Sequence, residues 1–155
     1  MVIFTAPYMP VPDEAKWNAV ANRYYKLWNI PNCIGVIDGE HIRIKKLCKT
    51  GSQNFSYKGY FSVVSMALAD ADGMFITIDV GNYGGNSDGA VFKTSKLGRL
   101  IRQKNLNIPP PRPLPHDGED NAFPFYFCGD EAFPLRKKHY ASISTKSFKR
   151  YKKNI

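Results

Sequence analysis

The chain has 155 residues, 43% of them hydrophobic, with a formal net charge of +9 and three cysteines. This length and composition suit a single domain with its own core, and the sequence has neither an apolar run of about 18 residues nor a charged-then-apolar leader, so we expect no membrane span and no secretory signal. The cysteines (Cys33, Cys48 and Cys128) form no CxxC pair, which argues against a disulfide framework or a zinc knuckle and favours the cytosol or nucleus.

The first predicted element is a helix over residues 12–29. Pro12 and Asp13 suit its first turn, and Pro31 stops it. Its apolar residues fall on one face at helical spacing, and we interpret this stripe as core packing rather than as a platform for stacking bases. The residues of the stripe are Trp17, Val20, Ala21, Tyr24, Leu27 and Trp28.

Three extended segments follow, at residues 33–45, about 60–69 and about 74–80. The second is almost continuously apolar, as expected of a central strand. An Asp-Gly turn joins it to the third and predicts a hairpin, so Asp70 and Asp72 are interpreted as turn residues rather than metal ligands.

The second half of the chain begins with a glycine-rich turn at residues 81–89. A helix is predicted over about 88–104, and the proline-rich segment 108–120 is predicted to be a surface loop. Residues 125–128 then form a short apolar strand. The order is therefore helix, three strands, helix, loop and strand.

Three aspartates stand at the ends or starts of these elements. Asp38 interrupts the first strand, Asp88 opens the second helix, and Asp130 follows the fourth strand. Each has an ordinary alternative, since acids commonly cap helices and form turns, and either Ser87 or Asp88 can cap the helix. Their joint placement favours a site where carboxylates from separate elements bind two Mg²⁺ or Mn²⁺ ions, which prefer oxygen ligands, for phosphodiester cleavage.

Basic residues surround the first of these acids. His41 is interpreted as a residue on the polar face of the strand, with proximity to the metal site as the alternative. We predict that these basic residues bind nucleic acid phosphates, although a solvent-exposed strand edge protected from pairing by lysines would have the same composition. The predicted nucleic-acid-binding residues are Arg43, Lys45, Lys46 and Lys58.

The net positive charge lies in the last residues. Residues 136–155 hold eight Lys or Arg and no acid, which leaves 14 basic and 13 acidic residues, a net of +1, over 1–135. Such a tail suits phosphate contacts or a nuclear address, and equally a solvated terminus. We expect a nuclear location, with the cytoplasm as a second one.

Several blocks together resemble the Harbinger-type (PIF/Harbinger) DDE transposases and the nucleases derived from them. The blocks are IDGEHI, NFSYKGYFS, SDGAVF and GDEAFPL, in that order, and the resemblance covers roughly residues 17–135. It implies an α/β, ribonuclease H-like fold with a mixed sheet: a three-stranded antiparallel meander, a helix and a fourth strand. It also implies a divalent metal, a DNA substrate, strand cleavage or joining, and a DNA-binding protein partner.

The resemblance assigns catalytic and metal-binding roles to the acids. Asp38 matches the family's first catalytic aspartate, and the second is Asp130, favoured by strand topology, or Asp88, favoured by the SDG block. The family's final glutamate lies on a later helix, but no acid follows Glu131 here. We therefore expect a partial catalytic domain over 1–135 that lacks its last strand and helix, then a basic tail over 136–155. The two hypotheses are a metal-dependent nuclease, inactive if the glutamate is essential, and a non-catalytic nucleic-acid or protein-binding remnant.

Overall fold

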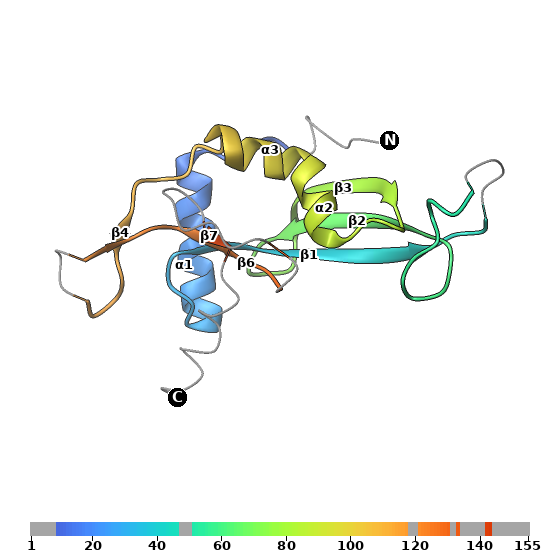
Figure 1. Cartoon of the computed structure of the whole chain (residues 1–155). Coiled ribbons are helices and arrows are strands. Elements are labelled where there is room, and N and C mark those ends of the chain that lie inside the picture. Colours follow the sequence, from blue (N-terminus) through green and yellow to red (C-terminus); the bar gives the residue numbers. More distant parts are fainter. Residues whose placement is uncertain (1–8, 47–50, 118–120, 131–132, 134–141, 144–155) are drawn as a thin grey trace.

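The computed structural model describes residues 9–46, 51–117, 121–130, 133 and 142–143 (Figure 1). This part of the chain is a mixed α/β structure with three helices, α1 (Glu14–Trp28), α2 (Asp88–Thr94) and α3 (Lys96–Gln103). Its strands are β1 (Cys33–Arg43), β2 (Ser62–Ala69), β3 (Phe75–Tyr83), β4 (Arg112–Pro113), β5 (Ala122–Phe123), β6 (Tyr126–Cys128) and β7 (Ser142–Ile143).

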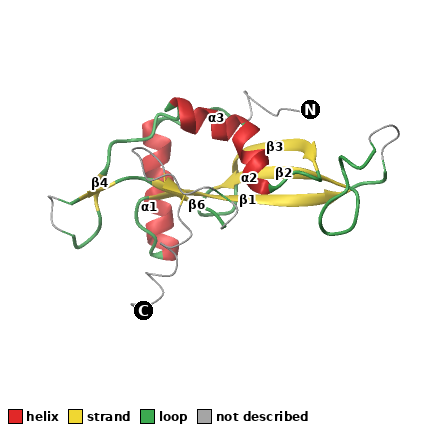
Figure 2. Ribbon diagram, viewed as in Figure 1, coloured by secondary structure: helices red, strands yellow, loops and turns green. Residues whose placement is uncertain are grey.

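Five of the strands form one mixed sheet in the order β3-β2-β1-β6-β7, while β4 and β5 pair separately. The three long strands β1, β2 and β3 lie side by side in Figure 2. The first three form the predicted antiparallel meander, and β6 adds to β1 in parallel. In the turn between β2 and β3, the Asp70 carboxylate accepts hydrogen bonds from the backbone N–H groups of Asp72 and Met74. This confirms that the Asp-Gly segment closes a hairpin.

Helix α1 lies against β1 and supplies one wall of the core. Its N-cap is Asp13, whose carboxylate accepts from the Lys16 backbone N–H at 2.8 Å. Trp17 is fully buried, its indole N–H donates to the Leu106 carbonyl, and its ring meets Phe127 edge-on at 5.9 Å. The predicted packing role of the stripe is confirmed there, although Trp28 at its far end is 61% exposed.

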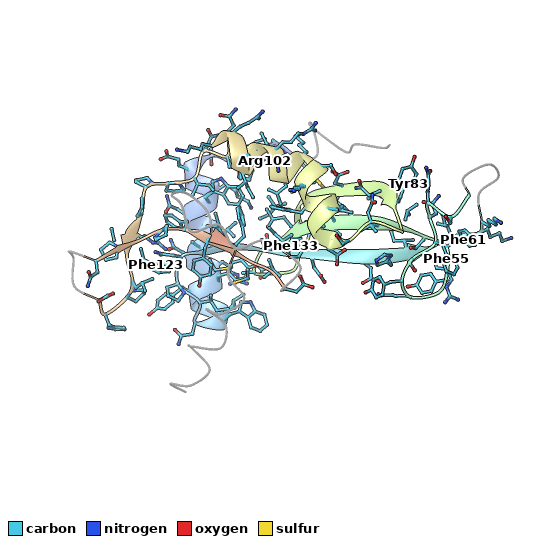
Figure 3. All side chains as sticks on the ribbon, viewed as in Figure 1. Phe55, Phe61, Tyr83, Arg102, Phe123 and Phe133 are labelled. Atoms are coloured by element: carbon cyan, nitrogen blue, oxygen red, sulfur yellow. The ribbon has the colours of Figure 1, made fainter. Side chains whose placement is uncertain are left out.

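The core continues beneath α2 and α3, where apolar residues from both helices meet β1, β2 and β6. Phe92 of α2 packs edge-on against Phe133, with ring centroids 5.6 Å apart (Figure 3). The helices therefore cover the face of the sheet that carries the buried residues of β1 and β2. The main buried contributors are Trp17, Ile34, Ile37, Val64, Leu68, Val91, Phe92, Phe125, Phe127 and Phe133.

The single helix predicted over 88–104 is wrong in one respect, because the chain leaves helical geometry at Ser95. Ser95 has φ −63° and ψ 157°, ends α2 and caps α3, and its hydroxyl accepts from the Gly98 backbone N–H. The Lys96 N–H also donates to the Asp79 carboxylate of β3 at 3.4 Å. A contact with a distant strand thus anchors the start of α3.

Two further expectations require correction. The proline-rich loop contains a short strand, β4, paired with β5. The last strand of the sheet is not missing, because β7 pairs in parallel with β6. Strand β7 lies within residues 136–155, which were predicted to form a basic tail. The boundary at residue 135 stays a prediction. The expected lack of a last helix concerns residues outside those described. None of the helices described is long and apolar enough to cross a membrane.

Candidate metal and nucleic-acid site

Two of the predicted acids belong to β1 and to the residues that follow its parallel neighbour β6. Val36 of β1 is in register with Cys128, the last residue of β6. Asp38 and Asp130 each come two residues later, and the same register continued past the end of β6 would place them level with each other. Both residues are exposed, and Asp38 also accepts a hydrogen bond from the Gly39 N–H at 2.8 Å.

The third acid approaches β1 from α2. Ser87 is the N-cap of that helix and accepts from the Ala90 N–H, so Asp88 is not needed for capping. Its carboxylate instead lies over Gly39, where a Cβ atom would come within 2.5 Å of Oδ1. Since side chains alternate along a strand, Asp88 lies on the opposite side of β1 from Asp38.

Electrostatics connect the three acids. Burial raises the pKa of the Asp88 carboxyl above its ordinary value, and the charges of Asp130 and Asp38 raise it further, against the opposing effects of His41 and Lys58. The buried Oδ1 atom of Asp88 has no hydrogen-bond partner in the described structure. A buried acceptor of this kind is costly unless something supplies a donor or a cation.

The donor chemistry fits a hard divalent cation, because carboxylate oxygens are the ligands that Mg²⁺ and Mn²⁺ prefer. Within the residues that the structure describes, however, no group of three His, Cys, Asp or Glu side chains converges closely enough to hold a metal ion. The described residues therefore offer exposed carboxylates on β1 and just after β6, and an unsatisfied carboxylate on the other side of β1, rather than a preformed three-ligand cage.

His41 is buried, so its assignment to the polar face of β1 is wrong. It follows Ile37 and Gly39 at two-residue intervals on the face beneath α2, and its Nδ1 lies 2.9 Å from the Ser62 hydroxyl. Its ring also meets Tyr57 edge-on, with centroids 5.4 Å apart. The two-residue spacing from the buried Ile37 is the signal in the sequence that indicates on which face of β1 His41 lies.

The predicted basic residues gather around aromatic rings next to this site. The Arg43 guanidinium lies 4.3 Å from the centre of the Tyr60 ring, and the Lys46 ammonium 5.7 Å from that of Phe61. Lys58 lies in the connection between β1 and β2, close in sequence to Tyr60 and Phe61, and its charge opposes the rise in the pKa of Asp88. Lys45 is exposed just after β1. The sequence indicated these cations but not the rings beneath them.

Comparison with known proteins gives a consistent set of relatives. A family model described as "DDE superfamily endonuclease" matches residues 37–154. "Protein ALP1-like" of Arabidopsis thaliana is 30% identical over 124 residues, which is 78% of this chain. "Putative nuclease HARBI1" of Bos taurus is 32% identical over 88 residues, 55% of this chain, and the Homo sapiens protein of that name is 31% identical over 88 residues.

The chain spans 30% of the ALP1-like protein's length and 24% of the length of either of these nuclease-named relatives. No solved structure matches the chain.

Proposed function

The chain belongs to the DDE superfamily endonuclease family, in agreement with the Harbinger-type resemblance of its motifs, and from this premise we propose that it is a transposase-derived nuclease domain that cleaves DNA phosphodiesters with divalent metal ions. The observation that supports the proposal is the parallel pairing of β1 with β6, whose register, continued two residues past Cys128, would place Asp130 level with Asp38. Asp130 follows the carboxyl end of β6, and Asp38 lies in the part of β1 that extends past that end.

The proposed fold is ribonuclease H-like. Its support is the order of the sheet, in which an antiparallel meander is extended by strands parallel to β1. The first strand of the meander and the first parallel strand then contribute one acid each, as the family resemblance implies.

In the proposed mechanism, Asp38 and Asp130 would hold the metal from one side of β1, and the unsatisfied carboxylate oxygen of Asp88 would reach it only after a movement of that side chain. When bound there, Mg²⁺ or Mn²⁺ ions would supply the positive charge that stabilises the attacking and leaving oxygens of phosphodiester cleavage. His41 and Lys58 partly offset the negative charge around Asp88. Arg43 and Lys58 bind phosphates and orient the strand, because cations beside such a site contact the backbone rather than the bases.

The first test measures melting temperature against Mg²⁺ or Mn²⁺ concentration. We expect either ion to raise the melting temperature of the natural sequence, because a ligand that binds only the folded state stabilises it. Asp38→Asn and Asp130→Asn should each abolish most of this rise. Asp117→Asn, which changes an exposed acid elsewhere in the chain, is the matched control and should keep it.

Nicking of supercoiled DNA in the same buffers tests the chemistry. If the domain turns over, Asp38→Asn should lower the rate on the order of 10³-fold or more, as loss of one member of a catalytic set does. Identical melting curves with and without metal, together with no nicking, would contradict the proposal.

The absence of a three-ligand cluster from the described residues favours a second candidate, a non-catalytic nucleic-acid-binding module. On that view the DNA affinity falls steeply with salt and survives Asp38→Asn. Changing Lys149, Arg150, Lys152 and Lys153 to Gln should then weaken binding, whereas an unchanged affinity and salt slope would exclude this use of the tail. We also propose a nuclear location and a DNA-binding partner protein, in keeping with the basic tail and the family.

A further inference from the structure

A turn between β1 and β2 lies against His41, and its Lys58 acts electrostatically on Asp88. We call residues 54–61 the Tyr57 turn. Its base is closed by a bridge between Phe55 and Phe61, whose rings meet edge-on at 5.2 Å (Figure 3). The Ser56 backbone N–H and hydroxyl both donate to the Tyr60 carbonyl at 2.9 Å, and the Gly59 N–H donates to the Ser56 carbonyl. These bonds fix the tip residues, Tyr57 and Lys58, in a defined loop.

The turn is also anchored to its surroundings. The Ser62 N–H donates to the Asn54 carbonyl at 2.7 Å, and the Gly85 N–H, in the turn before α2, donates to the Gln53 carbonyl at 3.0 Å. The segment that leads to Asp88 is therefore tied to the base of the Tyr57 turn. Its tip is held in a fixed relation to the candidate metal site.

Tyr57 is unusual because it is held in place and yet 83% exposed. The buried His41 ring contacts it edge-on, so the tyrosine ring leans against β1 while most of its surface faces solvent. A large apolar surface left open next to a candidate site suggests a contact with a ligand rather than a packing role. Phe55, at 47% exposure, extends this aromatic surface along the turn.

Cations accompany the exposed rings. Lys58 lies 5.9 Å from the centre of the Tyr57 ring, and Arg43 and Lys46 lie against Tyr60 and Phe61. A ligand that matches this surface has flat faces to stack on rings and a negative charge every few ångströms. Single-stranded nucleic acid has both properties, whereas a duplex hides the faces of its bases within the stack.

We infer that the Tyr57 turn binds an unpaired nucleotide of the DNA strand, with its base stacked on Tyr57 and its phosphate at Lys58. The inference rests on the proposed function for the identity of the substrate, and it adds that the substrate is single-stranded or locally opened next to the acids. Tyr57 acts here as a binding and positioning residue.

The test compares a short single strand with a hairpin duplex of the same sequence, each carrying a fluorescent purine analogue, in buffer with a chelator. The natural protein should bind the single strand more tightly and quench the analogue by stacking. Tyr57→Ala should weaken single-strand binding about tenfold or more and remove the quenching, because stacking contributes substantially for each base. Its duplex binding should change little, and Tyr57→Phe should restore both signals.

Two controls separate stacking from charge and from folding. Tyr25→Ala removes a partly exposed tyrosine on α1 and should leave binding unchanged. Lys58→Gln should weaken single strand and duplex alike and lower the salt slope by about one. Unfolding curves for each variant identify any loss that comes from misfolding, and Tyr57→Phe then decides the comparison.

The inference and the proposed function fail in different ways. Equal binding of single strand and duplex by the natural protein, or unchanged quenching in Tyr57→Ala, would overturn the inference. Neither result would affect the rise in melting temperature with metal, which depends on Asp38. Loss of the metal response with normal Tyr57-dependent stacking would instead overturn the nuclease proposal and keep the turn as a single-strand binding surface.

Discussion

The two halves of β1 differ in cover and in chemistry. Residues 33–37 are buried except at Val36, beneath α1 and beside β6, whereas residues 38–43 are largely exposed apart from His41. The change occurs next to the point where β6 ends, since Cys128 is level with Val36. Where the neighbouring strand stops, the sheet edge becomes available to polar side chains. The first half of β1 therefore stabilises the fold, and the second half carries the candidate site.

The largest expected loss of stability comes from a substitution in α1, the helix that covers the first half of β1. Trp17→Ala removes a fully buried ring that contacts Phe127 and Leu106, and should cost about 3–5 kcal/mol of unfolding free energy. That is a large part of the stability of an ordinary domain. Denaturant unfolding measures it. Trp28→Ala on the same helix is the control and should cost much less because Trp28 is mostly exposed. Equal losses of unfolding free energy in the two variants would contradict the difference in burial between Trp17 and Trp28.

The next effect tests the boundary between the halves. Gly39→Ala places a Cβ atom 2.5 Å from Asp88 Oδ1, so the Asp88 side chain or the strand must shift. We expect a loss of about 1–3 kcal/mol, the usual cost of overpacking. The double variant Gly39→Ala/Asp88→Ala removes the clash, and a double-mutant cycle should show a coupling of about 0.5–3 kcal/mol. Additive effects would mean that the two residues are not in contact.

A smaller effect concerns the charge of Asp88. Burial raises its pKa, so the folded state favours the protonated acid, and the ionised form lowers stability as the pH rises above the ordinary aspartate pKa of about 3.9. In metal-free buffer, Asp88→Asn should therefore raise the melting temperature slightly at neutral pH and change it little in acid. Melting curves across pH test this, with Asp117→Asn as the control. A lower melting temperature at neutral pH would contradict it.

The two halves of β1 could not be predicted equally well from the sequence. The meander and the buried stripe at Trp17 follow from hydrophobic pattern and turn chemistry, which are local signals, whereas the joint role of Asp38 and Asp130 stays a prediction. The burial of His41 depends on Ser62 and Tyr57, contributed by a later strand and turn. No periodicity within β1 reports such neighbours. The polar character of the second half of β1 was therefore predicted from its residue types, but the contacts of these residues were not.

The break at Ser95 and the strand β7 were missed for the same reason. Asp79 of β3 receives the Lys96 N–H, and this contact across the fold helps the chain restart as α3. The two residues of β7 carry no alternating pattern of useful length, and only their pairing with β6 identifies them as a strand. Elements that depend on one partner outside their own segment lie beyond what local propensity predicts.

The smallest effect tests what holds α1 over the first half of β1. The Arg23 guanidinium donates to both carboxylate oxygens of Asp72, at 2.6 and 2.9 Å, and ties α1 to the turn between β2 and β3. This pair lowers the pKa of Asp72, so its contribution exists above the ordinary aspartate pKa and disappears as the pH falls. Both side chains are nearly half exposed, and solvent and salt weaken such pairs. Arg23→Gln should therefore lower the melting temperature only slightly at neutral pH and low salt, and not at all in acid or high salt. A loss as large as that of Trp17→Ala would mean that the ion pair, rather than apolar burial, holds the helix in place.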